Sequence, residues 1–230
     1  MNAGEPGISA WQDGVVPPHT WQLSFNEIGA ITNAWADPDD GALVTWAVWA
    51  ADGLHHLLDL DNRMFGVSPR ELHGYTEEAL DLAHVRWASA SAITTLDLCA
   101  ATLGRRRCVK KGREYSLRDF DVKRPSNKQA KQATKKRISQ LEPAERTWVA
   151  GAINDPDYAT ILSARNPLIH GRLKRTLYGS TVPSGPHEDR TGFPVGPSAA
   201  VVDSRPLIKL CSEVATKHLE AFLSMIAAEK

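Results

Sequence analysis

One short string in the chain carries side chains whose types and spacing suit chemistry on a phosphate group. Arg165 and Asn166 precede Pro167, and His170 follows three residues later. The guanidinium group of an arginine is a fixed fork of donors, and the imidazole of a histidine exchanges a proton near neutral pH. The string therefore predicts a phosphate-directed pair, provided that the chain presents both side chains at one place.

The residues around this string predict how it is presented. Tyr158, Ile161 and Leu162 have the spacing of a helix, which we expect to end near Ala164. A new helix would then begin with Asn166 as its cap and a proline at its first position. This arrangement would hold the arginine at a break between two helices, with the histidine one turn into the second.

The string resembles the motif of the HEPN superfamily (higher eukaryotes and prokaryotes nucleotide-binding), in which an arginine, usually followed by a polar residue, precedes a histidine by a few positions. Arg165, Asn166 and His170 match these three positions. As an arrangement of helices, the resemblance extends over about residues 28–104 and 140–228. It implies an all-α, up-and-down helical bundle.

The resemblance also implies an activity: metal-independent endoribonuclease cleavage at a homodimer interface, without a cofactor. A ribose 2′-OH attacks the adjacent phosphate and leaves a 2′,3′-cyclic phosphate. His170 would act as general acid or base, Arg165 would neutralise charge on the phosphate, and Asn166 would position either group. A toxin–antitoxin or phage-defence setting, with a cognate antitoxin protein as partner, is consistent with this family. The alternative is a non-catalytic HEPN-like module that binds RNA or protein, or dimerises.

Charge is strongly segregated along the chain. The 27 basic and 27 acidic side chains cancel, but residues 1–104 have a balance of −11 and residues 105–137 a balance of +11. The basic segment either follows an RNA backbone or neutralises the acidic third of its own chain or of a second copy. An unrelated DNA-binding helical protein is a further alternative. Besides the motif, the candidate RNA-binding residues are Lys123, Arg124, Arg172, Lys174 and Arg175.

Two further groups of polar residues have competing interpretations. Asp97 lies near the apolar stripe of a long helix and is a candidate to orient Arg165, although a solvated position at the edge of the stripe is the simpler interpretation. His218 is expected to pack. A further group consists of carboxylates and histidines: Asp52, His55, His56, Asp59 and Asp61. It has no third metal ligand at a recognised spacing, so we expect a solvated helix end and no metal there.

Helix start and stop signals predict the elements that position these residues. We expect a single helical domain over residues 24–230, preceded by an arm over 1–23 that Trp11 and Trp21 anchor. Its predicted helices cover about 24–36, 38–60, 76–104, 126–139, a segment from 143, 156–164 and a segment from 204. We expect Gly104 to end the third of these helices. Residues 105–137 are a basic insertion with a possible small hairpin over 108–117, and 178–203 form a long Gly/Pro-rich loop.

Other features bound the class of protein. Apolar residues at 42% and charged residues at 23% are typical of a globular chain. Three widely spaced cysteines suit free thiols rather than a disulfide framework. The chain has no apolar stretch of the roughly 18 residues that a membrane span needs. We therefore expect a cytoplasmic protein without a membrane partner.

Overall fold

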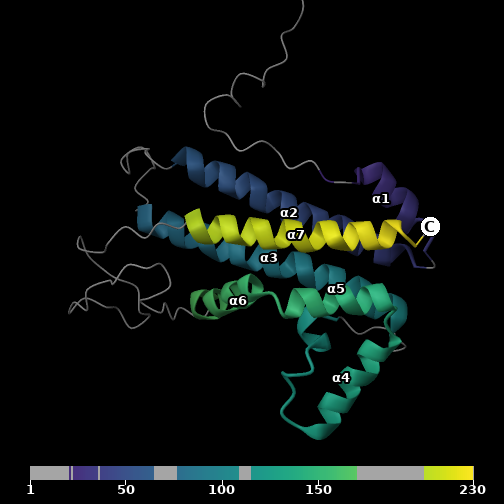
Figure 1. Ribbon diagram of the computed structural model, residues 1–230. Helices are drawn as coiled ribbons and strands as arrows, with labels where there is room; N and C mark the ends of the chain where they lie inside the picture. Colours follow the sequence, from purple (N-terminus) through teal and green to yellow (C-terminus); the bar gives the residue numbers. More distant parts are fainter. Residues whose placement is uncertain are drawn as a thin grey trace, which may run out of the picture.

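A computed structural model describes residue 21 and residues 23–35, 37–64, 77–108, 115–169 and 205–229, with the backbone alone at 38, 59–64, 77–82, 164–169 and 205. Within these ranges the chain forms seven α-helices, one short 3-10 helix and no strand, which confirms the all-α class (Figure 1). The elements are α1 (Phe25–Thr32), α2 (Pro38–Met64), α3 (Glu77–Arg107), η3 (Leu117–Phe120), α4 (Lys128–Gln140), α5 (Pro143–Ile153), α6 (Pro156–Ile169) and α7 (Arg205–Ala227).

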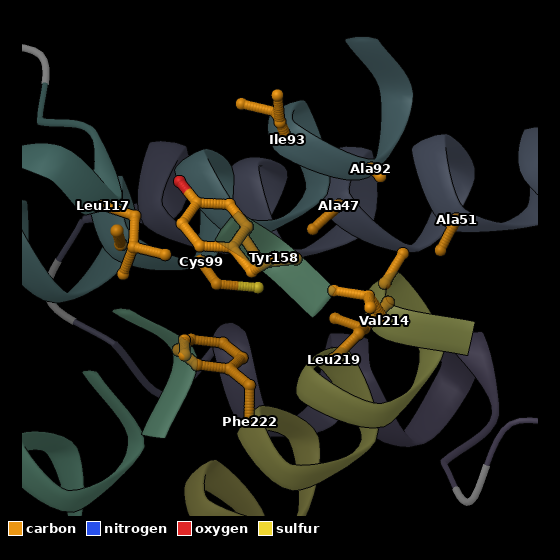
Figure 2. Close-up of a cluster of buried hydrophobic side chains, with 14 of the residues drawn as sticks. Ala47, Ala51, Ala92, Ile93, Cys99, Leu117, Tyr158, Val214, Leu219 and Phe222 are labelled. Atoms are coloured by element: carbon orange, nitrogen blue, oxygen red, sulfur yellow. The ribbon is translucent and has the colours of Figure 1, made fainter. Parts of the chain in front are cut away.

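The centre of the bundle is made by α2, α3 and α7, which pack against one another along their lengths (Figure 1). On α7 the buried residues recur at spacings of three and four, from Leu207 through Cys211, Val214 and His218 to Phe222, as the sequence predicts. The remaining helices and η3 add buried side chains to the same apolar cluster. Figure 2 shows part of it, with Tyr158 and other side chains close to Cys99.

Local sequence sets most helix starts. At α1, Ser24 and Glu27 form the expected capping box. Asp37 accepts a hydrogen bond from the backbone of Asp39, so the α2 entry is also capped. Trp21 anchors the end of the N-terminal arm as expected, since its Nε1 donates to Asp52 Oδ1 at 2.6 Å, and Trp11 lies outside the described residues.

The prediction that Gly104 ends the third helix is wrong, because α3 continues to Arg107. A Cβ at this position would lie 2.4 Å from Cγ and Cδ2 of Tyr115. The glycine therefore permits the close approach of a buried aromatic ring within the helix, and the predicted basic insertion begins with the last turn of α3.

The predicted break at Ala164 is also wrong, because α6 runs without interruption through Pro167 to Ile169. Proline removes one backbone hydrogen bond, the one that the carbonyl of Ser163 would accept. Ser163 is exposed, so water can take the place of the missing donor. The predicted hairpin over 108–117 lies mostly outside the described residues, and η3 begins at its last position.

The three cysteines are free and buried. Burial raises the pKa of Cys211 to about 12 and also raises those of Cys99 and Cys108, so these thiols are unreactive core residues. None of the described helices is long and apolar enough to cross a membrane.

Candidate functional site

The helix that carries most of the motif packs against α3 and α7. Position 165 of α6 lies four residues after the buried Ile161 and seven after the buried Tyr158, so it falls on the face that packs against the bundle. Position 166 lies one step further round. His170 lies outside the described residues, as do Arg172, Lys174 and Arg175. Their proposed roles stay predictions.

The start of α6 is fixed by a buried carboxylate. Asp155 Oδ1 accepts from the backbone N of Asp157 at 2.9 Å, which caps the helix. Asp155 Oδ2 accepts from Lys217 Nζ at 2.9 Å and from His218 Nε2 at 2.7 Å. The beginning of α6 is thus tied to α7. His218 packs as predicted, but it also holds this carboxylate, a role that its sequence position alone does not indicate.

Protonation in this cluster follows from burial and hydrogen bonding. Burial by itself would raise the pKa of Asp155, but the hydrogen bonds from Lys217 and His218 outweigh it and lower the pKa to about 2. Burial lowers the pKa of His218, and Asp155 only partly opposes this effect. At neutral pH the pair is therefore a carboxylate that accepts from a neutral imidazole.

The end of α6 lies at the same end of the bundle as the start of α7 and the start of α3 (Figure 1). Arg165 stands nine residues after Pro156, about 14 Å along the helix axis. Asp97, the candidate to orient Arg165, accepts a hydrogen bond from the backbone N of Leu117 at 2.8 Å and so supports η3. Its pairing with Arg165 stays a prediction.

The described residues of the basic segment include two groups of cations with different environments. In the first group, the last turn of α3, all three arginines meet carboxylates of the same chain. Arg105 Nε donates to Asp40 Oδ1 at 2.7 Å, and its Nη2 lies 3.0 Å from Asp37 Oδ2. These contacts neutralise part of the acidic N-terminal third, which is one of the two roles that the sequence leaves open.

The other two arginines of that turn reach the second half of the chain. Arg107 Nε donates to the buried Glu145 at 2.9 Å, and Arg106 Nη2 donates to Glu229 at 2.6 Å. The Arg106 guanidinium also lies over the ring of Trp35, 4.1 Å from its centroid. The cations of this turn thus connect the residues around the start of α2 with α5 and the segment after α7, and each has a carboxylate partner within the chain.

The second group lies on α4, which projects from the bundle below α5 (Figure 1). Every residue of α4 is described, and Thr134 is its buried residue. Among the described residues no carboxylate lies within ion-pair distance of four exposed lysines on this helix: Lys128, Lys131, Lys135 and Lys136. With Gln129, Gln132 and Ser139 they make up the outward side of α4, which we call the lysine face.

Anchoring residues fix the base of this projection. The guanidinium of Arg137 donates to the backbone carbonyl of Asp119, and Tyr115 and Phe120 are buried in the common core. Lys123 Nζ donates to Asn154 Oδ1 at 3.1 Å, next to the start of α6. Because both aromatic rings of the segment are buried, base stacking on them is excluded in this arrangement.

The sequence prediction named two residues of this region, Lys123 and Arg124, and missed the lysine face. Both named side chains are exposed in the turn before α4. The spacing of the lysines could have predicted this face. Positions 128, 131, 135 and 136 are three, four and one residues apart, which places them on one side of a helix that Asn127 caps. Placing them on one outward side also requires that Thr134 is the buried position.

Two members of the polar group on α2, Asp52 and His55, have internal partners, and the side chains of Asp59 and Asp61 lie outside the described ones. His55 forms hydrogen bonds with Thr216 at 3.1 Å and Ser212 at 3.3 Å, and Asp52 accepts from Trp21. In the part of the chain that the structure describes, no three His, Cys, Asp or Glu side chains are grouped as metal ligands.

No protein-family model, curated protein or solved structure matches this chain. The resemblance to the HEPN superfamily therefore rests on Arg165, Asn166 and His170 and on the helical class of the fold.

Proposed function

We propose that this protein binds RNA on the lysine face of α4 and cleaves it as a metal-independent, HEPN-type endoribonuclease with Arg165, Asn166 and His170. The observation that carries the binding part is a projecting helix with four exposed lysines and no acidic residue. Such a face attracts a polyanion, because its cations release the counterions of the phosphates that they neutralise. The catalytic part rests on the motif.

The spacing of the lysine face suits a contact with successive phosphates. Lysines three or four residues apart on one side of a helix are separated by about 5–6 Å. The uncharged donors Gln129, Gln132 and Ser139 lie among them and add hydrogen bonds without sequence preference. The face therefore favours backbone contacts over base-specific recognition.

Lys123, in the turn before α4, lies close to the start of the helix that carries most of the motif. Lys123 contacts Asn154 just before α6, and Arg165 lies about 14 Å further along that helix. A single strand of a few nucleotides has the length to extend over this distance. We expect an RNA bound at α4 to continue past Lys123 along α6.

Binding is tested by fluorescence anisotropy with a labelled single-stranded RNA. The double variant K135Q/K136Q removes two phosphate contacts, and at 0.1 M salt we expect the affinity to fall about 25-fold. The matched control R146Q/K209Q removes two cations from the exposed surfaces of α5 and α7. Binding by the control should stay within about twofold of wild type. Equal losses in both variants would assign the binding to net charge and contradict a site on α4.

Cleavage is tested separately, with wild type and His170→Ala incubated with RNA in the presence of a metal chelator. Loss of a general acid or base is expected to slow cleavage by at least about 100-fold. Mass spectrometry of the products should find 2′,3′-cyclic phosphate ends. If both proteins cleave at the same rate, the catalytic assignment is wrong.

The second candidate function is a non-catalytic RNA-binding module, and the lysine face favours it as well because binding there needs no motif. Wild-type protein that binds RNA through α4 and yields no cyclic-phosphate product would select this function. A partner protein such as an antitoxin would then act on binding and not on cleavage.

A further inference from the structure

The N-terminal arm meets the helical bundle on α2. Trp21 Nε1 donates to Asp52 Oδ1 at 2.6 Å, and the Trp21 ring meets the His55 ring edge-on, with 6.1 Å between the centroids. His55 is itself held between α2 and α7 by its hydrogen bonds with Ser212 and Thr216. Residues 1–20 lie outside the described ones, and Trp21 sets the place on α2 where they join the bundle.

Two exposed tryptophans of α2 lie next to this anchor. Asp52, Trp49 and Trp46 are each three residues apart, so they are neighbours on one side of the helix, with about 5–6 Å between successive Cβ atoms. The exposed fractions are 52% for Trp46 and 58% for Trp49. Together the two rings, which we call the aromatic row, expose roughly 200 Å². The anchored end of the arm therefore lies at one end of the aromatic row.

The surface beside the aromatic row is uncharged and open. From Gly41 to Ala51 α2 carries no charged residue, although a helix side that faces water in a globular protein normally does. The neighbouring position is Gly53, where an added Cβ would meet no atom within 4 Å, so no described segment covers the helix there. The exposed His56 lies one turn beyond Asp52, outside the row.

The sequence just before the anchor matches this surface in polarity. From Ile8 to Thr20 the chain has one carboxylate, Asp13, and neither lysine nor arginine. Two consecutive prolines favour the extended polyproline II conformation, and segments of this kind dock on surfaces lined by aromatic rings. The apolar members closest to the anchor are Trp11, Val15, Val16, Pro17 and Pro18.

The lengths also agree. A polyproline II segment rises by about 3.1 Å per residue, so the two prolines, three and four residues before Trp21, reach about 9–12 Å from it. Trp46, the far end of the aromatic row, lies about 10–12 Å from Asp52. The anchor also makes the contact intramolecular, which gives the arm a high effective concentration at this surface.

We infer that residues 11–18 of the N-terminal arm pack on Trp46 and Trp49, so that the chain covers its own aromatic row. RNA is not the occupant, because the row has no cation beside it from Gly41 to Ala51. Trp87, which is 61% exposed on α3, lies outside the row and stays exposed to water. The inference involves neither the motif nor the lysine face and is independent of the proposed function.

The test is fluorine NMR of the whole chain labelled with 5-fluorotryptophan, with the resonances assigned by the variants W46F, W49F and W87F. The shift of each resonance on exchange of water for D₂O measures how far water reaches the ring. In wild type we expect a smaller shift for Trp46 and Trp49 than for Trp87. Changing all four residues from Val15 to Pro18 to serine should raise the shifts of Trp46 and Trp49 to the level of Trp87.

The matched control replaces Pro183 and Pro186 with serine in the other Pro-rich segment and should keep the wild-type shifts. Helix content measured by circular dichroism should be the same in all three proteins, since every substitution lies outside the helices. Equal shifts for the three tryptophans in wild type would overturn the inference, and so would shifts that the four serines leave unchanged. Protection of Trp46 and Trp49 that rises with protein concentration would assign the row to a second copy and overturn it as well.

Discussion

The cations at the end of α3 and those on α4 belong to one basic stretch of sequence, yet their environments are opposite. Arg105, Arg106 and Arg107 all contact carboxylates that are far away in the sequence. The lysine face of α4 has no such partner among the described residues. Two groups of cations from one basic stretch therefore differ in use: the arginines of α3 form ion pairs within the chain, and the lysines of α4 leave a surface for an external anion.

The difference follows from where each group of cations lies. The last turn of α3 lies where the start of α2, the start of α5 and Glu229 after α7 come together, so its arginines have carboxylate partners from other parts of the chain. The base of α4 is held by η3, and the rest of the helix extends away from the bundle (Figure 1). A long basic side chain on such a projection remains solvated unless a ligand arrives.

The strongest test of this comparison removes one cation from each group. Arg107→Met leaves the buried carboxylate of Glu145 without its closest partner, and we expect a loss of about 3 kcal/mol in the free energy of unfolding. Lys136→Met should change it by less than about 0.5 kcal/mol. Denaturation by urea, followed by circular dichroism, measures both, and similar losses would erase the distinction between the groups.

Salt dependence tests the lysine face directly. Four phosphate contacts with single-stranded RNA predict that the affinity falls about 50-fold between 50 and 200 mM salt. The variant K128Q/K131Q/K135Q/K136Q should bind weakly and respond to salt only slightly. A variant with the slope of the wild-type protein would show that other cations contact the RNA.

Acidification should weaken the internal contact between Asp155 and His218. Asp155 has a pKa of about 2 when folded, below its ordinary value of 3.8, so its contribution is complete above about pH 4 and is lost as the pH falls toward 2. The pKa of His218 is also lowered, so its contribution begins to fall below about pH 6.5.

The expected loss from Asp155 is roughly 2 kcal/mol, measured as the free energy of unfolding against pH. Asp155→Asn should remove the part of this dependence between pH 4 and 2. An unchanged pH profile in the variant would contradict the assignment to Asp155.

The smallest expected effect concerns the contact between Gly104, near the end of α3, and Tyr115, which precedes η3. Gly104→Ala places a methyl group against the ring of Tyr115, and we expect a destabilisation of about 1–2 kcal/mol from overpacking. The control is Gly151→Ala on α5, where a Cβ meets nothing within 4 Å and the higher helix propensity of alanine should stabilise by up to about 1 kcal/mol. The thermal midpoints should shift in opposite directions; shifts of the same sign would assign Gly104 no packing role.

Helix starts were predictable from the sequence because capping is local. Ser24 with Glu27, Asp37 before Pro38 and Asp155 before Pro156 each satisfy backbone groups within three residues. Helix ends were less predictable. At Gly104 and at Pro167 the helix continues, because the aromatic ring that requires the glycine and the packing that holds α6 come from elsewhere in the chain.

The sequence by itself determined the helical class, the capped helix starts, the apolar stripe of α7 and the separation of charge into −11 and +11. Only the tertiary structure decided which cations are used internally. Arg105 is 65 positions from Asp40, and Arg106 is 123 from Glu229. Contacts across such distances depend on how the helices pack, and no local pattern encodes them. The same packing decided that α4 projects with its lysines outward and that three tryptophans of α2 and α3 face away from the core.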